Sequence, residues 1–237
     1  MAKMTFLLAG LLVVLLLLPA AFAAPVPATG LTSGVSSQRD LSNLNTTSVD
    51  AVAGNVTRLD INALSITQSW QGYYGNISGN MVLADAGNNS MYEWGNGTSV
   101  TGEVYASRND TISWATINCS NTTVIAAEET YLGQTSGDAD SVTNTFNGTA
   151  HPSFLVGGRN MTSCPSTNAF VNGGSQTTDY HQVLLADGSG KTVYTTLIDH
   201  GAIGYDGNQW DFELMVGENE HAGSEGPTIY YFFTELG

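Results

Sequence analysis

Short apolar segments separated by Gly-rich and Asn-rich turns recur along this chain from residue 64 to its last residues. They are rich in β-branched and aromatic residues, and several alternate apolar with polar positions, which is typical of strands. We expect strands in LSITQSW, GEVYAS, TISWATI, SFLVGG, YHQVLLAD, KTVYTTLI, WDFELMV and TIYYFFTEL. Because no helices alternate with them, the pattern predicts a mainly β fold, an antiparallel β-sandwich of the Ig-like or jelly-roll-like kind.

One or two short helices are expected to interrupt these strands. The segment SNTTVIAAEETYLG, residues 120–133, is the best helix candidate. Ser120 or Asn121 can cap its N-terminus, and Gly133 can end it. The polar region from 133 to 147 predicts either a loop or a second short helix.

Two segments resemble each other and predict two hairpins. VLADAGNNSMY (82–92) and LLADGSGKTVY (184–194) each read as strand, tight turn and strand. Gly87 in the first, and Gly188 or Gly190 in the second, would supply the positive φ that such turns need. A duplicated hairpin and two unrelated hairpins are both compatible with the similarity.

The N-terminus has the pattern of a secretory leader. Lys3 precedes the apolar run FLLAGLLVVLLLL, and Pro19 precedes the small-residue sequence AAFAA. This order favours cleavage after Ala23 or Ala24, with a retained membrane anchor as the alternative. We expect no transmembrane segment after leader removal, and an extracellular or cell-surface location. The predicted division is a signal peptide at 1–24, a flexible or strand-donating arm at 25–60 and a β-sandwich domain at 61–237.

The chain without its leader is strongly acidic. Five basic residues remain against 21 acidic ones, so the net charge is −16. Nucleic acid is excluded as a partner, because phosphate binding needs a basic face that five basic residues do not supply. Only 11% of all residues are charged, so Ser, Thr, Asn and Gly provide most of the polarity.

Ten Asn-X-Ser/Thr sequons are the strongest statistical signal, since roughly four would arise by chance in this composition. They begin at Asn45, Asn55, Asn76, Asn88, Asn96, Asn109, Asn118, Asn121, Asn147 and Asn160. The excess predicts covalent N-linked glycans. None follows Asn160, which indicates either a C-terminal surface kept bare, for example against a neighbouring subunit, or chance.

One sequon lies within an apolar stretch, QGYYGNISGNMVLAD, residues 71–85. Its aromatic and aliphatic residues, such as Tyr73 and Ile77, share one parity, and Asn76 has the other. The alternation predicts one strand that buries the first set and exposes Asn76. Core formation and glycosylation are then compatible in the same strand.

Cys119 and Cys164 are the two cysteines, 45 positions apart. In an exported chain this pair favours a disulfide over two free thiols or a metal site. Closing such a loop would contribute about 3 to 4 kcal/mol in the chain-entropy model.

Catalytic patterns are weak, and the sequence predicts a protein that is not an enzyme. The four histidines, His151, His181, His200 and His221, lack metal-protease spacing, and no Gly-X-Ser-X-Gly turn is present. Calcium is the only cofactor suggested. Asp138 and Asp140 in GDADS, and Asp206 in DGN, offer hard oxygen donors in loops, and solvated turns are the favoured alternative.

The segments SWQGYYGN, GEVYASRNDTISWATINC, HPSFLVGG, YDGNQWDFELMV and YYFFTELG resemble a family of archaeal exported, N-glycosylated, β-rich surface proteins. The resemblance covers most of the chain from about Leu64 and implies no catalytic residues. More loosely, the leader, arm and β domain are similar to archaeal extracellular filament subunits, in which an N-terminal strand completes a neighbour's sheet. The arm departs from that pattern, because VDAVAGNVTRLDI is not a strongly alternating apolar strand.

These observations predict a structural subunit of an extracellular filament or surface layer, a homopolymer assembled by β-strand addition. The alternative is a lectin-like or adhesive module that stacks sugars on exposed aromatic residues such as Trp70, Tyr73, Tyr74 or Trp94. An exported hydrolase is a third, weaker possibility.

Overall fold

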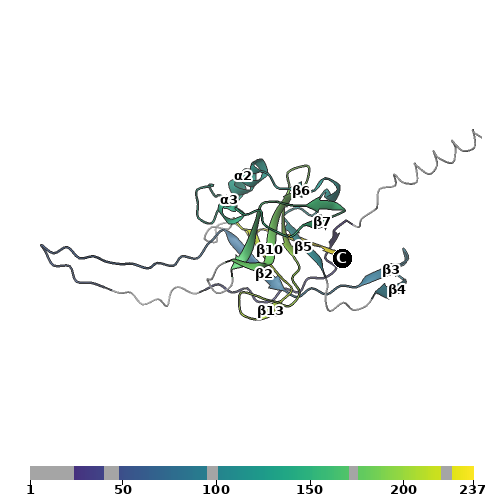
Figure 1. The fold of residues 1–237 in the computed structure, drawn as a ribbon, viewed down its shortest axis with the longest axis horizontal. Coiled ribbons are helices and arrows are strands. Elements are labelled where there is room, and N and C mark those ends of the chain that lie inside the picture. The colour runs from purple at the N-terminus through teal and green to yellow at the C-terminus, as the bar shows by residue number, and fades with distance from the viewer. Residues whose placement is uncertain (1–23, 40–47, 95–100, 171–175, 220–225) are drawn as a thin grey trace, which may run out of the picture.

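The computed structural model of the chain describes residues 24–39, 48–94, 101–170, 176–219 and 226–237 (Figure 1). Every strand pair in these ranges is antiparallel, and two short α-helices accompany them. The prediction of a mainly β fold with one or two inserted helices is therefore confirmed. The Ig-like or jelly-roll-like type stays a prediction.

The largest sheet contains β1 (Val26–Pro27), β5 (Gly102–Ser107), β6 (Asn118–Cys119), β9 (Ser166–Phe170), β10 (Gln176–Ala186), β11 (Thr192–Leu197) and β15 (Tyr231–Leu236). Its seven strands run in the order β1-β15-β5-β11-β10-β6, and β9 also pairs with β10. The smaller pairs are β2 (Trp70–Gly75) with β14 (Phe212–Gly217), β3 (Met81–Ala84) with β4 (Ser90–Trp94), β7 (Phe154–Val156) with β8 (Arg159–Met161), and β12 (Ala202–Ile203) with β13 (Gln209–Trp210). The helices are α2 (Thr122–Tyr131), α3 (Val142–Thr145) and one 3-10 turn, η1 (Trp114–Thr116).

Both faces of the central strands are buried, because their apolar residues occupy odd and even positions alike. Tyr105 of β5 packs into one core, whereas its neighbours Val104 and Ala106 pack into the other. Leu184 and Leu185 of β10 divide in the same way. The central strands therefore form the middle layer of the body.

The first core lies between this sheet and the β7–β8 hairpin with η1. It includes Phe154, Val156 and Met161 from the hairpin, and Trp114 of η1 packs against it. The predicted disulfide between Cys119 and Cys164 is confirmed, and it lies against this core.

The second core lies between the opposite face and the β2–β14 pair with the two helices. Leu214 and Val216 of β14 are buried there, as are Leu132 after α2 and Val142 of α3. Trp70, at the start of β2, packs against Phe146 and Tyr194.

Helix α2 confirms the expected helix and its signals. The side-chain oxygen of Asn121 accepts hydrogen bonds from the N–H groups of Thr123 and Val124, both at 3.0 Å, which makes it the N-cap. Gly133 has a φ of 66° just beyond the helix.

The two similar segments form two hairpins, β3–β4 and β10–β11, with the same turn. An aspartate, Asp85 or Asp187, accepts the N–H groups two and four residues later through one carboxylate oxygen. The residue three positions later has a positive φ: 64° at Asn88 and 83° at Gly190. The expectation of a positive φ was therefore wrong for Gly87, because in the shared turn the positive φ falls one residue later, at Asn88.

Three strand predictions were wrong. Residues 71–85 form two strands, β2 and β3, and Leu83 is 51% exposed rather than in the core. TISWATI contains η1 instead of a strand. Its Ile112 and Ile117 are buried in the first core and Trp114 packs against it, without strand pairing. LSITQSW is irregular until Trp70.

Candidate functional site

The glycan acceptor sites are the first candidate functional feature. Asn45 and Asn96 lie outside the described residues. Among the other eight, Asn109 is half-buried and seven are exposed: Asn55, Asn76, Asn88, Asn118, Asn121, Asn147 and Asn160. These positions are compatible with a sugar coat, and glycosylation itself stays a prediction.

Asn118 and Asn121 flank the disulfide closely. Asn118 Oδ1 accepts the N–H of Cys119 at 2.9 Å, and Asn121 is the cap of α2. Glycans attach through the amide nitrogen, so these contacts of the oxygen atoms block neither site. We still expect one glycan rather than two, because the acceptors are three residues apart.

The N-terminal arm is held at both of its ends. Pro25 is buried, and Val26 and Pro27 form β1 on the outer side of β15. The N–H of Ala28 donates to Phe232 O at 3.0 Å. Beyond residue 28 the arm leaves the body, and the described residues 48–68 lead back to it at β2 (Figure 1).

The returning half of this arm exposes apolar side chains. Val56 is 101% and Ile61 82% exposed, and Leu59 and Leu64 are more than half exposed. No strand of the described chain pairs with residues 48–68. We call residues 56–64 the arm segment.

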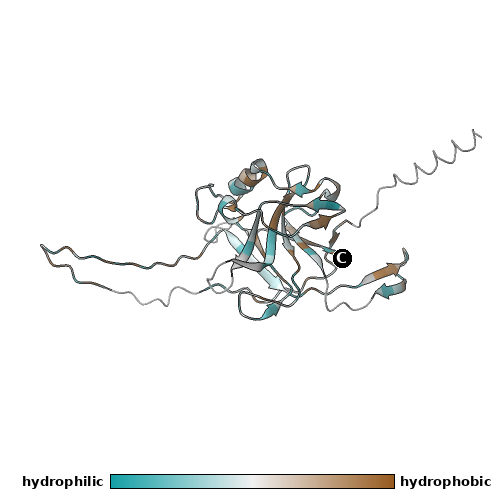
Figure 2. Ribbon diagram, in the orientation of Figure 1, coloured by the Kyte–Doolittle hydropathy of each residue, from teal (hydrophilic) through white to brown (hydrophobic). Residues whose placement is uncertain are grey.

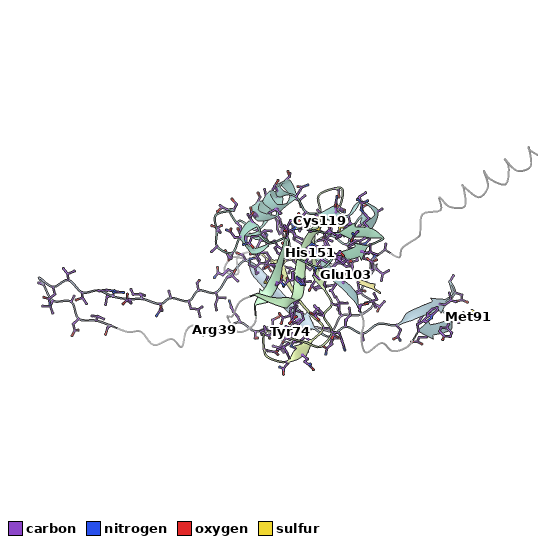
Figure 3. All side chains as sticks on the ribbon, in the orientation of Figure 1. Arg39, Tyr74, Met91, Glu103, Cys119 and His151 are labelled. Atoms are coloured by element: carbon purple, nitrogen blue, oxygen red, sulfur yellow. A yellow bond between two sulfur atoms is a disulfide. The ribbon has the colours of Figure 1, made fainter. Side chains whose placement is uncertain are left out.

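The β3–β4 hairpin also lacks a covering layer. Val82, Leu83, Met91, Tyr92 and Trp94 are all between 46% and 84% exposed. The hairpin projects from one side of the body and the arm from the other (Figure 1), and β3 is hydrophobic (Figure 2). Met91 accordingly lies far from the body in Figure 3.

β2 offers a free backbone edge. It pairs with β14 on one side, and within the described ranges no strand pairs with its other side. Glu218 N donates to Ser69 O, one residue beyond the Gly217–Trp70 pair. Because peptide groups alternate sides along an antiparallel ladder, those of Gly72 and Tyr74 face the open side.

An aromatic cluster forms around Tyr74 of β2. The Tyr74 ring lies 4.9 Å from that of Tyr205 and 5.0 Å from that of Trp210, both centroid to centroid. Tyr74 and Tyr205 are about half exposed. Of the other aromatic residues suggested for sugar stacking, Trp70 packs into the second core and Tyr73 packs on Phe232.

The calcium hypothesis receives no geometric support. Asp138 accepts the N–H of Thr135, Asp140 accepts the hydroxyl of Thr67, and Asp206 accepts the N–H of Trp210 Nε1. Across the described ranges, no group of three or more His, Cys, Asp or Glu side chains could hold a metal ion.

Two of the histidines make specific contacts. Nδ1 of His200 lies 2.6 Å from Oδ1 of Asp211. His151 Nε2 accepts the N–H of Cys164 at 2.9 Å. His221 lies outside the described residues.

Two charged clusters, each with a buried glutamate, were not expected from the sequence. In the first, Arg108 pairs with Glu128, whose other oxygen accepts the Tyr194 hydroxyl at 2.9 Å. The guanidinium also lies 3.5 Å from the ring centroid of Tyr131. The second contains Glu103 and Glu235. A charged residue inside the otherwise apolar strand GEVYAS was the only available signal for it.

Comparisons of the chain with protein-family models, with curated proteins and with solved structures found no match. Within the described residues, no helix is long and apolar enough to cross a membrane. The disulfide is consistent with an extracellular location.

Proposed function

We propose that the chain is a secreted, N-glycosylated structural subunit that assembles with copies of itself by β-strand addition. The observation that carries this proposal is a pair of uncovered elements, the arm and the β3–β4 hairpin, on opposite sides of the body (Figure 1). Contacts between unlike surfaces of identical subunits generate open filaments when they do not close into rings.

The arm segment supplies the strand in this proposal. Its exposed Val56, Leu59, Ile61 and Leu64 would be removed from water by pairing with a neighbour. Each such side chain contributes roughly 1.5 to 3 kcal/mol when fully buried. The open edge of β2, with the outward peptide groups of Gly72 and Tyr74, is the acceptor that we favour.

The hairpin supports the same proposal for a separate reason. An isolated two-stranded hairpin is only marginally stable in water, and β3–β4 exposes five large apolar residues. A neighbouring subunit that covers it would stabilise both partners. The proposal also treats the β2–β14 pair and the main sheet as the two layers of a β-sandwich, with glycans on the remaining surface.

The test compares two variants of the leader-free chain. The arm variant carries Leu59→Ser, Ile61→Ser and Leu64→Ser, and its control carries Val35→Ser, since Val35 is 98% exposed but outside the arm segment. We expect the arm variant to remain a folded monomer by sedimentation and electron microscopy, while the control polymerises like the unmodified chain. Normal polymers from the arm variant would exclude the arm as the donor.

A lectin-like module is the second candidate, and the Tyr74–Tyr205–Trp210 cluster favours it. Aromatic residues on a surface can stack on sugar rings, and the neighbouring carboxylates of Asp206 and Glu213 can accept hydrogen bonds from hydroxyl groups. A glycan array separates the candidates. Selective binding by a monomer, lost in Tyr74→Ala and retained in Tyr92→Ala, would favour the module.

A further inference from the structure

A pair of carboxylates, one buried and one half-buried, lies near the edge of the main sheet. Glu103 of β5 and Glu235 of β15 stand directly opposite each other, and Glu103 is only 7% exposed. The Tyr105 hydroxyl lies 3.3 Å from a carboxylate oxygen of each. Two carboxylates brought together in a poorly hydrated place require either a proton or a cation.

No basic side chain of the described residues supplies that cation. Arg58 pairs with Asp60, Arg108 with Glu128, and His200 with Asp211. Arg159, on the adjacent β8, instead donates to Ala115 O at 3.3 Å. Burial and the nearby Glu235 raise the pKa of Glu103 to about 8, and burial also raises the pKa of Glu235.

The beginning of the described chain lies beside Gly157, a residue that contacts Glu235. Ala24 Cα lies 3.8 Å from the position that a Cβ atom on Gly157 would occupy. The N–H of Gly157 donates to both oxygens of Glu235, at 3.1 and 3.2 Å. Pro25 is buried, and β1 then pairs with β15, the strand that carries Glu235.

The sequence indicates what Ala24 becomes after leader removal. Ala21-Phe22-Ala23 matches the small-X-small pattern that precedes a leader cleavage site. Hydrolysis of the Ala23–Ala24 bond consumes one water, leaves a carboxylate on Ala23 and creates an amine on Ala24. This amine takes up a proton at neutral pH, since its ordinary pKa is about 7.7 to 8.0.

We propose that Glu103 and Glu235 form a binding site for the α-ammonium group that leader removal creates on Ala24. The new cation compensates one negative charge of the pair, and the ion pair fixes β1 on the edge of β15. Before cleavage, the nitrogen of Ala24 is an uncharged amide and cannot serve in this way. The inference rests on the expected leader cleavage and is independent of polymer assembly.

The first experiment measures the pKa of the α-amino group by NMR in a chain prepared to begin at Ala24. We expect it to lie at least one unit above its ordinary range, because the carboxylates favour the charged form. The rise should disappear in Glu103→Gln/Glu235→Gln. It should persist in Asp110→Asn, a control that removes an exposed carboxylate elsewhere in the chain. An ordinary α-amino pKa in the unmodified chain would overturn the proposal without reference to any variant.

A second experiment compares this chain with the same chain acetylated at Ala24. Acetylation should lower the unfolding midpoint in the unmodified sequence and have little effect in Glu235→Gln. An equal loss in both would mean that the carboxylate is not the partner of the terminus. The mass of the exported protein tests the cleavage site separately, and a terminus other than Ala24 would overturn the assignment to this residue.

Discussion

At the scale of single residues, Arg108 stabilises the fold by pairing with a buried carboxylate. It neutralises Glu128, whose side chain is only 2% exposed, and it stacks on Tyr131. We expect Arg108→Met to lower the free energy of unfolding by about 3 to 5 kcal/mol, because it leaves a buried charge without a partner. Urea denaturation measures this loss.

The matched control for this variant also changes the acid. Arg108→Met/Glu128→Gln should recover part of the stability, since no uncompensated charge remains buried. A smaller loss of unfolding free energy in Arg108→Met than in Arg108→Met/Glu128→Gln would contradict this account of the pair.

Gly190 tests the turn shared by the two hairpins. Its φ is 83°, and an added Cβ would meet its nearest atom, Val124 Cγ2, at 3.9 Å, so backbone conformation and not space limits the position. We expect Gly190→Ala to cost about 1 kcal/mol in unfolding free energy. Gly190→Asn should cost less, because Asn tolerates this conformation and occupies the equivalent position as Asn88. Equal costs, measured by thermal unfolding, would argue against this view of the turn.

At the scale of elements, the disulfide joins β6 to the segment between β8 and β9. We expect Cys119→Ser/Cys164→Ser to lose about 4 kcal/mol of unfolding free energy, since the closed loop spans 45 positions. Denaturation with and without a reducing agent checks this, and the double variant should not respond to the reductant.

The sequence predicted those elements whose local signals agree with their packing. Helix α2 has a cap at Asn121 and a stop at Gly133, and the terminal apolar stretch forms β15. Prediction from the sequence failed where apolar residues are buried without strand pairing. Ile112 and Ile117 carry the pattern of a strand, but they pack across the first core from either side of η1.

The candidate sites show the same limit. Asn76 is exposed as the sequence predicted, but it lies just beyond the end of β2 and not within the one alternating strand that was expected. The facing of Glu103 and Glu235 depends on the pairing of β5 with β15, which are more than a hundred residues apart. No local pattern encodes that register. No local pattern predicts that β1 pairs with β15 either.

At the scale of the whole molecule, net charge opposes self-assembly. A leader-free chain with a charge of −16 repels its copies, and salt screens this repulsion over a Debye length of about 10 Å at 0.1 M. We therefore expect the critical concentration for polymerisation to fall as NaCl rises from 10 to about 300 mM. Light scattering measures it, and an unchanged or higher value would mean that opposite charges drive the contact.

The buried acids predict a pH dependence for the chain acetylated at Ala24. Glu103 has an ordinary pKa of 4.5 and a folded pKa of about 8, so between these values the folded state holds a proton that the unfolded state releases. Stability should therefore decline as the pH rises from 5 to 8, by about 1.4 kcal/mol per unit of pKa difference at most. Urea denaturation across this range measures the decline, and Glu103→Gln should flatten it.

Fastening the arm at β1 and again at β2 has a topological result. A strand with a free end can be threaded into a neighbour, whereas a closed loop can only be laid alongside one. Subunits joined through such loops would separate sideways, with no segment to be pulled out. A fibre built in this way could exchange a damaged subunit from its middle as readily as from its tips.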